Sequence, residues 1–518
     1  MSNRRWLLMI FWMLAAAPVN AQYTGSIKGQ VVDPQGAPVA GATLALTGSE
    51  LPGRKTAVAN EAGNYIFLGL PPGVYMLEVT RPGFHAFTQA GIILRAGSTL
   101  ISDVKLALAD ITQTIEVAAR GGGEKIPIVD AGNPGQNFNV SGEFINRLPL
   151  SSRQNWESVW FLVPGAVTIG RNGPDGVNFD PQVHGASERS NIYKLDGFEI
   201  GNALTNQGWT TQFSVEAIQD AQIKTSGLDA STSLGQGGYI NIITKSGGNK
   251  VHGSASFFSQ PRSFNGNNAP GGSPLDQELH QPDLALGGPL IKDKTWFFAS
   301  YRRVFFNQGI ARAPAALQTF IENGFSPPSY DLRERNHRFL GKITHNLTND
   351  DILTFSYLND GGVTLNSDSR DLGTQETTVN VHNGGPAYQI SWVSTLTPRL
   401  LLNMQYGYRA ISSDVDLNGG DAPAVNRYAA TTISAGNLAG QSLILQYGNR
   451  AGGASGSKGA RDHHELTGDI SYIKEGWRGQ HIFQAGMQWK PRTRIESDSF
   501  FPGDGHVFTD EVRRVIGG

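Results

Sequence analysis

The sequence has 518 residues, no cysteine and a formal net charge of −2. The near-neutral charge gives no field that would draw the chain to nucleic acid, and the lack of cysteine excludes a disulfide framework and a thiolate zinc site. With 64 glycines, 9% aromatic residues and only 17% charged residues, the composition favours β-structure broken by turns, in about three domains by length.

The N-terminus has the pattern of a secretory signal peptide. Arg4 and Arg5 precede an apolar run at 6–17, and the small residues Val19 and Ala21 follow it. The run is shorter than the roughly 20 residues that a membrane-spanning helix needs. We therefore predict a signal peptide over 1–21 that is cleaved after Ala21, and an exported protein.

Residues 22–109 alternate short apolar runs with Gly/Pro turns, which predicts a small antiparallel β-sandwich. The phrases GSIKGQVVDPQGAPVAGATLAL, NEAGNYIFLGLPPGVYMLEV and PGFHAF closely resemble the carboxypeptidase regulatory-like domain. The resemblance implies an accessory fold without catalytic machinery, which occurs beside metallocarboxypeptidases and ahead of plug domains.

The chain shows no catalytic or metal-binding constellation. Its eleven histidines are scattered, and His463-His464-Glu465 is the single cluster of histidine with an acid. Neighbouring residues of a strand point to opposite faces, so these three side chains cannot converge on one metal. We expect them to be solvated barrel positions, and we expect no cofactor, no metal and no enzymatic activity.

Residues 125–248 predict a second, α+β unit. Ser141 is placed to cap a short helix over 141–148, and a second helix is expected over 151–162, ending before Pro164-Gly165. Further on, VHGASERSNIYKLDGFEI, VEAIQDAQIKTSGLDAS and LGQGGYINIITKSGGNKVHGSASFF resemble, in this order, the plug domain of TonB-dependent outer-membrane receptors.

Two motifs carry this resemblance. Leu195, Asp196 and Gly197 look like the plug's Asp-Gly turn between two strands. Gly235, Gly237 and Gly238 look like the entry to its last strand. A phosphate loop would have to open a helix, whereas these glycines precede a β-branched strand at 239–245, so they favour tight turning or close packing.

From residue 249 to 518 the sequence alternates in the manner of a transmembrane barrel, with an apolar, aromatic face opposite a polar, glycine-tolerant face. In one strand the apolar face holds Leu402, Met404, Tyr406 and Tyr408, and the polar face holds Asn403, Gln405, Gly407 and Arg409. Short turns at 348–351 and 398–399 contrast with long polar stretches at 259–281, 307–335, 360–385 and 411–462, the asymmetry of periplasmic and extracellular rims. The segment LGGPLIKDKTWFFASYRR resembles the corresponding sequence of the Oar-like subgroup of these receptors.

About nine strands can be counted, whereas plugged barrels of this class have about 22. We therefore expect an incomplete barrel from a truncated copy. The predicted fold class is mainly β, with an N-terminal sandwich, an α+β plug and an incomplete transmembrane antiparallel barrel.

The resemblance implies a protein of the Gram-negative cell outer membrane, in contact with its lipid, that takes up a scarce solute such as a siderophore, oligosaccharide or peptide. Energy would reach it through a TonB-type energy-transducing protein that pairs with an extended segment in the linker 110–124. The candidate segment is Ile111, Thr112, Gln113, Thr114, Ile115, Glu116 and Val117. Candidate solute contacts in plug loops are Arg171, Asn172, Asp175, Asn202, Asn206 and Trp209.

The residues leave alternatives open. The segment at 111–117 can equally be the last strand of the sandwich, and the plug loops can be ordinary solvated loops. The whole chain can also be a carbohydrate-binding or adhesive surface protein whose barrel only displays the sandwich, or a soluble periplasmic β-protein.

Overall fold

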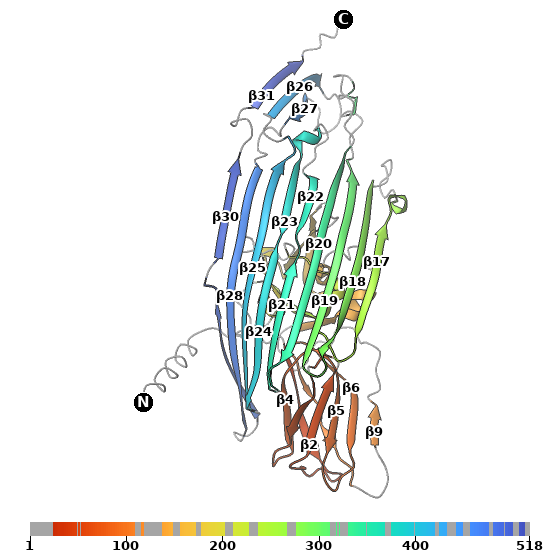
Figure 1. Cartoon of the computed structure of the whole chain (residues 1–518), viewed down its shortest axis with the longest axis vertical. Helices are drawn as coiled ribbons and strands as arrows, with labels where there is room; N and C mark the ends of the chain where they lie inside the picture. Colours follow the sequence, from red (N-terminus) through yellow and green to blue (C-terminus); the bar gives the residue numbers. More distant parts are fainter. Residues whose placement is uncertain are drawn as a thin grey trace, which may run out of the picture.

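The computed structural model describes residues 24–108, 115–118, 137–148, 156–171, 178–201, 211–226 and 237–512, apart from single residues and short segments within the first and last of these ranges. The predicted signal peptide lies outside the described residues. Figure 1 shows a tall curved sheet with the plug elements behind it and a small sandwich at one end.

The sandwich at that end is built from two sheets. One has the order β4-β1-β7, with β8 also paired to β1, and the other has the order β3-β2-β5-β6-β9. The strands are β1 (Gly25–Val32), β2 (Thr43–Gly48), β3 (Lys55–Val58), β4 (Asn64–Leu70), β5 (Gly73–Thr80), β6 (Phe87–Leu94), β7 (Thr99–Ile101), β8 (Val104–Lys105) and β9 (Ile115–Ala118). Alternation along β5 buries Tyr75, Leu77 and Val79 between the two sheets, so the period-2 pattern creates this core.

The plug contains a five-stranded sheet in the order β10-β15-β16-β13-β14 and a separate hairpin of β11 and β12. The strands are β10 (Asn137–Ser141), β11 (Ala166–Arg171), β12 (Asn178–Val183), β13 (Ile192–Leu195), β14 (Phe198–Glu199), β15 (Ile218–Lys224) and β16 (Tyr239–Thr244). Short helices accompany them: α2 (Gly142–Arg147) and the 3-10 helices η1 (Trp156–Leu162), η2 (Glu188–Ser190) and η4 (Val215–Ala217). Within the described part of the chain, no helix is both long enough and apolar enough to cross a membrane.

The two predicted plug helices have different outcomes. The Ser141 cap is confirmed, because its Oγ accepts a hydrogen bond from the backbone N–H of Phe144 at 3.2 Å at the start of α2. The second helix differs from the prediction: residues 156–162 form the 3-10 helix η1 rather than an α-helix, and 151–155 lie outside the described residues. Trp156 and Trp160 anchor η1 in the plug core, so tertiary packing decides the local conformation here.

The tall sheet has twelve strands among the described residues. They are β17 (His252–Gln260), β18 (Gln277–Ile291), β19 (Thr295–Gly309), β20 (Asp331–Asn346), β21 (Asp351–Asn359), β22 (Gly362–Ser367), β23 (Val379–Gly384), β24 (Pro386–Thr397), β25 (Leu400–Leu417), β28 (Gly456–Glu475), β29 (Gln480–Trp489) and β30 (Thr493–Phe500). The short connections between β20 and β21 and between β24 and β25 lie at the sandwich end, which is therefore the periplasmic end.

The two faces of this sheet differ as the alternation predicts. On β24, Tyr388 and Ile390 are exposed on the outer face, while Gln389 and Ser391 are buried on the inner face against the plug. We call this inner face the wall. The predicted fold class, with a sandwich, an α+β plug and an antiparallel barrel sheet, is confirmed.

Two of the long polar stretches were misjudged from the sequence. The stretch 360–385 contains the strands β22 and β23. The stretch 411–462 contains the end of β25, which continues to Leu417, the strands β26 (Ala424–Thr432) and β27 (Ser442–Gly448), and the start of β28. The strand β26 pairs with β27 on one side and with β31 (Val507–Val512) on the other, in a separate small sheet. The strands β22 and β23 have six residues each and only two alternating apolar positions, too short a pattern to stand out among polar neighbours, so the estimate of nine strands was too low.

Candidate functional site

The LDG motif forms a two-residue turn between β13 and β14 of the plug. Asp196 has φ of 48° and Gly197 has φ of 85°, so both lie in the left-handed region. A hairpin turn with positive φ at both central residues favours Asp or Asn followed by Gly. Leu195 packs into the plug core, and the turn projects the Asp196 carboxylate towards the wall.

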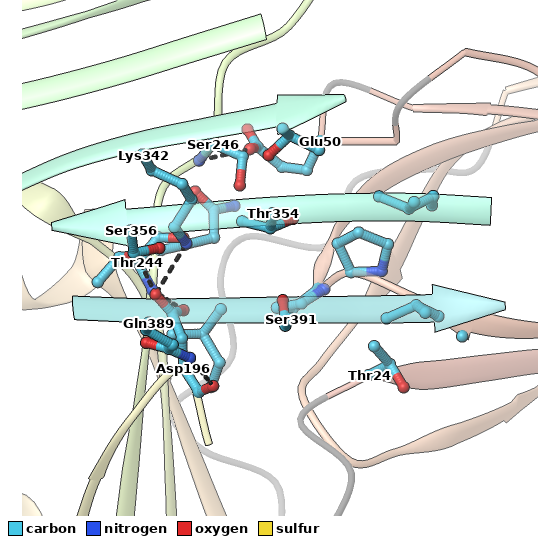
Figure 2. Close-up of a pocket in the computed structure, with 18 residues that line it drawn as sticks. Thr24, Glu50, Asp196, Thr244, Ser246, Lys342, Thr354, Ser356, Gln389 and Ser391 are labelled. Atoms are coloured by element: carbon cyan, nitrogen blue, oxygen red, sulfur yellow. Dashed lines mark hydrogen bonds and ion pairs between the residues drawn. The ribbon is translucent and has the colours of Figure 1, made fainter. Parts of the chain in front are cut away.

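The Asp196 carboxylate joins plug and wall. It accepts hydrogen bonds from the backbone N–H of Thr244 at 2.9 Å and from the Thr244 hydroxyl at 2.5 Å, both within the plug. It also pairs with the Lys342 ammonium of β20 at 2.9 Å, and the two side chains are only 8% and 6% exposed. Figure 2 shows this pair between the plug and the sheet.

The backbone of the same turn is held by the wall as well. The Asp196 carbonyl accepts from the side-chain amides of Gln389 on β24 at 2.8 Å and of Gln405 on β25 at 2.7 Å. Beside them, a Cβ on Gly407 would lie 2.3 Å from the ring of Phe198, so only glycine leaves room for this plug side chain. The polar, glycine-tolerant wall face is therefore shaped to receive the turn.

Other plug–wall contacts are also polar and buried. The Ser214 hydroxyl donates to Asp283 at 2.6 Å, and the backbone N–H of Gln212 donates to Asp360 at 2.8 Å. Three more contacts join the two strands of the LDG hairpin to the wall. They are the ion pairs Lys194–Glu465 at 3.9 Å and Lys490–Glu199 at 2.8 Å, and the hydrogen bond from the Glu199 N–H to Glu465 at 3.1 Å. The plug is therefore fastened to the wall through hydrogen bonds and ion pairs as well as through apolar contacts, because the wall side chains Phe298, Leu340 and Leu358 join the hydrophobic cluster of the plug core.

The histidine–acid cluster takes part in this interface, which corrects its interpretation as solvated positions. His463 and Glu465 are 4% and 1% exposed, and they face the plug. The ring of His463 contacts the Glu199 carbonyl at 3.0 Å and stacks on Phe198. His464 lies on the opposite face, where its ring contacts the Tyr406 hydroxyl at 2.7 Å, as the strand alternation requires. The described residues contain no group of three His, Cys, Asp or Glu side chains that could hold a metal.

Two glycines of the GQGG motif lie where backbone and side chains pack closely. A Cβ on Gly237 would lie 2.4 Å from Asn191 Oδ1, and a Cβ on Gly238 would lie 2.7 Å from the Trp160 ring. The Gly238 N–H also donates to Asn191 Oδ1 at 2.7 Å, at the start of β16. Gly235 lies outside the described residues.

The candidate solute and TonB residues are described only in part. Asn172, Asp175, Asn202, Asn206 and Trp209 lie outside the described residues, and Arg171 ends the strand β11.

Of the TonB candidate segment, residues 111–114 lie outside the described residues, while 115–118 form β9. This strand pairs in parallel with β6 of the sandwich, with Phe87 opposite Ile115 and Gln89 opposite Val117. The segment is thus a sheet-edge strand in this structure, the kind of backbone that strand addition uses.

Sequence reasoning missed two charged residues that hold the units together, Lys342 and Asp220. A cationic side chain at an inward position of β20 was the available signal for Lys342. Asp220 had no comparable signal in the sequence, because β15 is buried along almost its whole length and polar and apolar residues therefore do not alternate between two faces.

Asp220 holds the sandwich against the plug. Its carboxylate accepts from the backbone N–H of Ala96 at 2.9 Å and from the Asn139 amide at 3.2 Å, and Arg95 lies 3.8 Å away. The Asn139 amide also donates to the Ala96 carbonyl at 3.1 Å. Desolvation by burial raises the pKa of Asp220 above its ordinary value, although these donors and Arg95 oppose the rise.

The raised pKa of Asp220 predicts a pH-dependent stability. Between the ordinary carboxyl pKa and the raised one, the folded protein holds a proton that the unfolded chain has lost, so its stability rises as pH falls through the folded pKa. The free energy of unfolding of the full chain in detergent should therefore increase, relative to the Asp220→Asn variant, as pH falls from about 7 to about 4. Chemical denaturation of both proteins across this range measures the difference, and a difference independent of pH would contradict the prediction.

Comparisons with known proteins agree with this architecture. Residues 26–108 match the family model of the carboxypeptidase regulatory-like domain, and residues 243–331 match that of an outer membrane beta barrel domain. The TonB-dependent transporter Oar of Myxococcus xanthus is 27% identical over 364 residues, which are 64% of this chain and 33% of that protein. The chain therefore spans about a third of the length of this curated relative.

One of the solved structures that resemble the chain shares its fold with a TM-score above 0.5. The outer membrane transporter YddB from Escherichia coli superposes with a TM-score of 0.52 at 15% identity, covering 70% of this chain and 48% of that one. The siderophore receptor PirA from Acinetobacter baumannii gives a TM-score of 0.46 at 15% identity, covering 71% of this chain and 48% of that one. The resemblance predicted from the sequence is thus confirmed: this is an outer-membrane protein related to the TonB-dependent transporters, with a carboxypeptidase regulatory-like domain ahead of its plug and barrel sheet.

Proposed function

We propose that the protein acts in TonB-dependent uptake of a scarce solute across the outer membrane. The observation that supports this most is the plug fastened to the wall at the Asp196 turn by contacts that water can replace. A domain that has to shift inside a barrel requires an interface that opens without exposing a large apolar surface. The relative with a curated description is a transporter, not an enzyme, and we propose that this chain likewise has no catalytic activity of its own.

We further propose that the segment 111–117 is gripped by a TonB-type energy-transducing protein. Its last residues already form an edge strand, and strand addition relies mainly on backbone hydrogen bonds. The solute class remains a choice among siderophores, oligosaccharides and peptides. The candidate contacts in the loops around Asn172 and Trp209 have polar and aromatic side chains that suit any of them.

Deleting residues 111–117 in the intact receptor should reduce uptake to the level of cells without the energy-transducing protein, while surface binding is retained. The Glu116→Gln variant is the matched control and should transport normally, because it keeps the backbone and removes only a charge. Uptake and surface binding are measured separately with radiolabelled ferric siderophores, oligosaccharides and peptides. Undiminished uptake after the deletion would disprove the assignment of this segment.

A further inference from the structure

We propose a function for the sandwich, building on the proposed uptake function: it closes the periplasmic end of a passage between plug and wall. The sandwich lies at the end of the sheet with the short turns, directly below the plug. Any solute that leaves between plug and wall on this side meets the sandwich first. The sandwich would therefore have to undock during transport.

The passage is visible as a cavity of about 70 Å³ that is bounded by all three units. Figure 2 shows the wall strands and the plug on one side and sandwich loops on the other. Its wall side is lined by small hydroxyl-bearing residues and by two apolar side chains on neighbouring strands, namely Thr344, Thr354, Ser356 and Ser391 together with Ile352 and Val393. Short polar side chains leave space next to the plug and can exchange hydrogen bonds with water or with a polar solute.

The sandwich supplies the floor of this cavity through the turn that joins β4 and β5. Pro71 and Pro72 line the cavity, and their rings restrict the backbone of the turn. The Tyr75 hydroxyl donates to the Pro71 carbonyl at 2.5 Å, which fixes the turn further. At Gly69 a Cβ would lie 3.1 Å from the Leu401 side chain, so the sandwich backbone rests directly on the wall. The floor is therefore rigid and closely fitted.

Two carboxylates, the buried Asp220 and the partly buried Glu50, hold the sandwich in this place. Asp220 of the plug, whose side chain is 1% exposed, accepts from the Ala96 N–H of the sandwich. On another side, Glu50 of the sandwich accepts from the backbone N–H of Ser246, just after the last plug strand, at 3.4 Å. These two contacts are polar, so each can be exchanged for hydrogen bonds with water at a small net cost, whereas the apolar contact of Gly69 with Leu401 and Val393 also has to open when the sandwich leaves.

The test uses the natural absence of cysteine. The Ser391→Cys variant carries a single thiol on the wall, at a position 6% exposed and lining the cavity. The purified full chain in detergent micelles is reacted with a polyethylene-glycol maleimide, and the labelling rate is measured. A Ser300→Cys variant serves as reference, because Ser300 is buried on the wall, 2% exposed, but does not line the cavity.

We expect slow labelling at position 391 in the parent background. The Asp220→Ala substitution should accelerate it about tenfold or more, because it leaves the Ala96 N–H without its acceptor and so favours undocking. Asp220→Asn, which keeps an acceptor oxygen, and Arg95→Ala, which removes only the more distant partner, should have smaller effects in the same direction. Labelling at position 300 should stay slow in every background.

A disulfide provides the rescue. A Cβ on Gly97 would lie 2.1 Å from the Gln222 amide nitrogen, so these two positions adjoin, and Gly97→Cys with Gln222→Cys is used to tie the sandwich to the plug once the loss of both free thiols has verified the bond. After oxidation, this pair should restore slow labelling at position 391 in the Asp220→Ala background. Fast labelling in the parent, an unchanged rate in both Asp220→Ala and Arg95→Ala, faster labelling at position 300, or no rescue by the disulfide would each overturn the proposal. The assay needs neither a solute nor an energy-transducing protein, so its failure is distinct from a failure of the uptake proposal.

Discussion

Replacing Asp196 with alanine is expected to destabilise the folded chain by about 3–5 kcal/mol, because it leaves the buried Lys342 ammonium without its counter-charge. The same change removes the acceptor of the Thr244 N–H and hydroxyl. It also places alanine at positive φ, a conformation that aspartate tolerates because its side chain can hydrogen-bond to the nearby backbone. All three effects act in one direction. Chemical denaturation of the full chain in detergent measures the sum.

Two matched variants separate the causes. Asp196→Asn tolerates positive φ but keeps only one of the two oxygens that accept from Thr244 and Lys342, so it should lose the charge and one acceptor and cost less stability than Asp196→Ala. Adding Lys342→Met to Asp196→Ala removes the unpaired charge and should recover part of the lost stability. If the double variant is no more stable than Asp196→Ala, the buried ammonium is not the cause.

Replacing Trp156 with alanine is expected to cost about 3–5 kcal/mol, because it empties the centre of the plug core. Trp156 is 0% exposed and stacks on Phe213, with ring centroids 5.5 Å apart. Its indole N–H donates to the Thr211 carbonyl at 2.8 Å, so the substitution also leaves a buried acceptor without its donor.

The Trp156→Phe variant keeps the aromatic stacking and loses only the hydrogen bond and part of the volume, so its cost should be clearly smaller. Denaturation followed by near-ultraviolet circular dichroism reports the aromatic core of the plug directly. Equal stability of Trp156→Ala and the parent would show that residues 156–162 are not an anchored part of this core.

The features that could be predicted from sequence are those in which local chemistry and tertiary structure agree. Ser141 caps α2 because a hydroxyl accepts from a free helix N–H wherever the helix lies. The alternation of Tyr388 and Ile390 with Gln389 and Ser391 reflects two different environments on the two faces of one strand. These signals depend on a few neighbouring residues, so no knowledge of the rest of the chain was required.

The features that could not be predicted depend on partners far away in the chain. Lys342 meets Asp196 only after the plug has entered the barrel, and Asp220 meets Ala96 only after the sandwich has docked. The periodicity of hydrophobic residues along the chain does not predict such long-range contacts. The strands β22 and β23 were missed for a different reason, since each has only six residues and two alternating apolar positions, too short a pattern to stand out among polar neighbours.

The polar character of the plug–wall interface has a mechanical consequence. When an apolar interface slides, surface that was buried must face water, and the cost grows with the area uncovered. Around Asp196 each broken contact is instead exchanged for a contact with water, at a net cost of about 0.5–1.5 kcal/mol for an ordinary hydrogen bond. The contacts around Asp196 can therefore give way one at a time, whereas the apolar contacts of Phe298, Leu340 and Leu358 with the plug core resist sliding in proportion to the area that is uncovered.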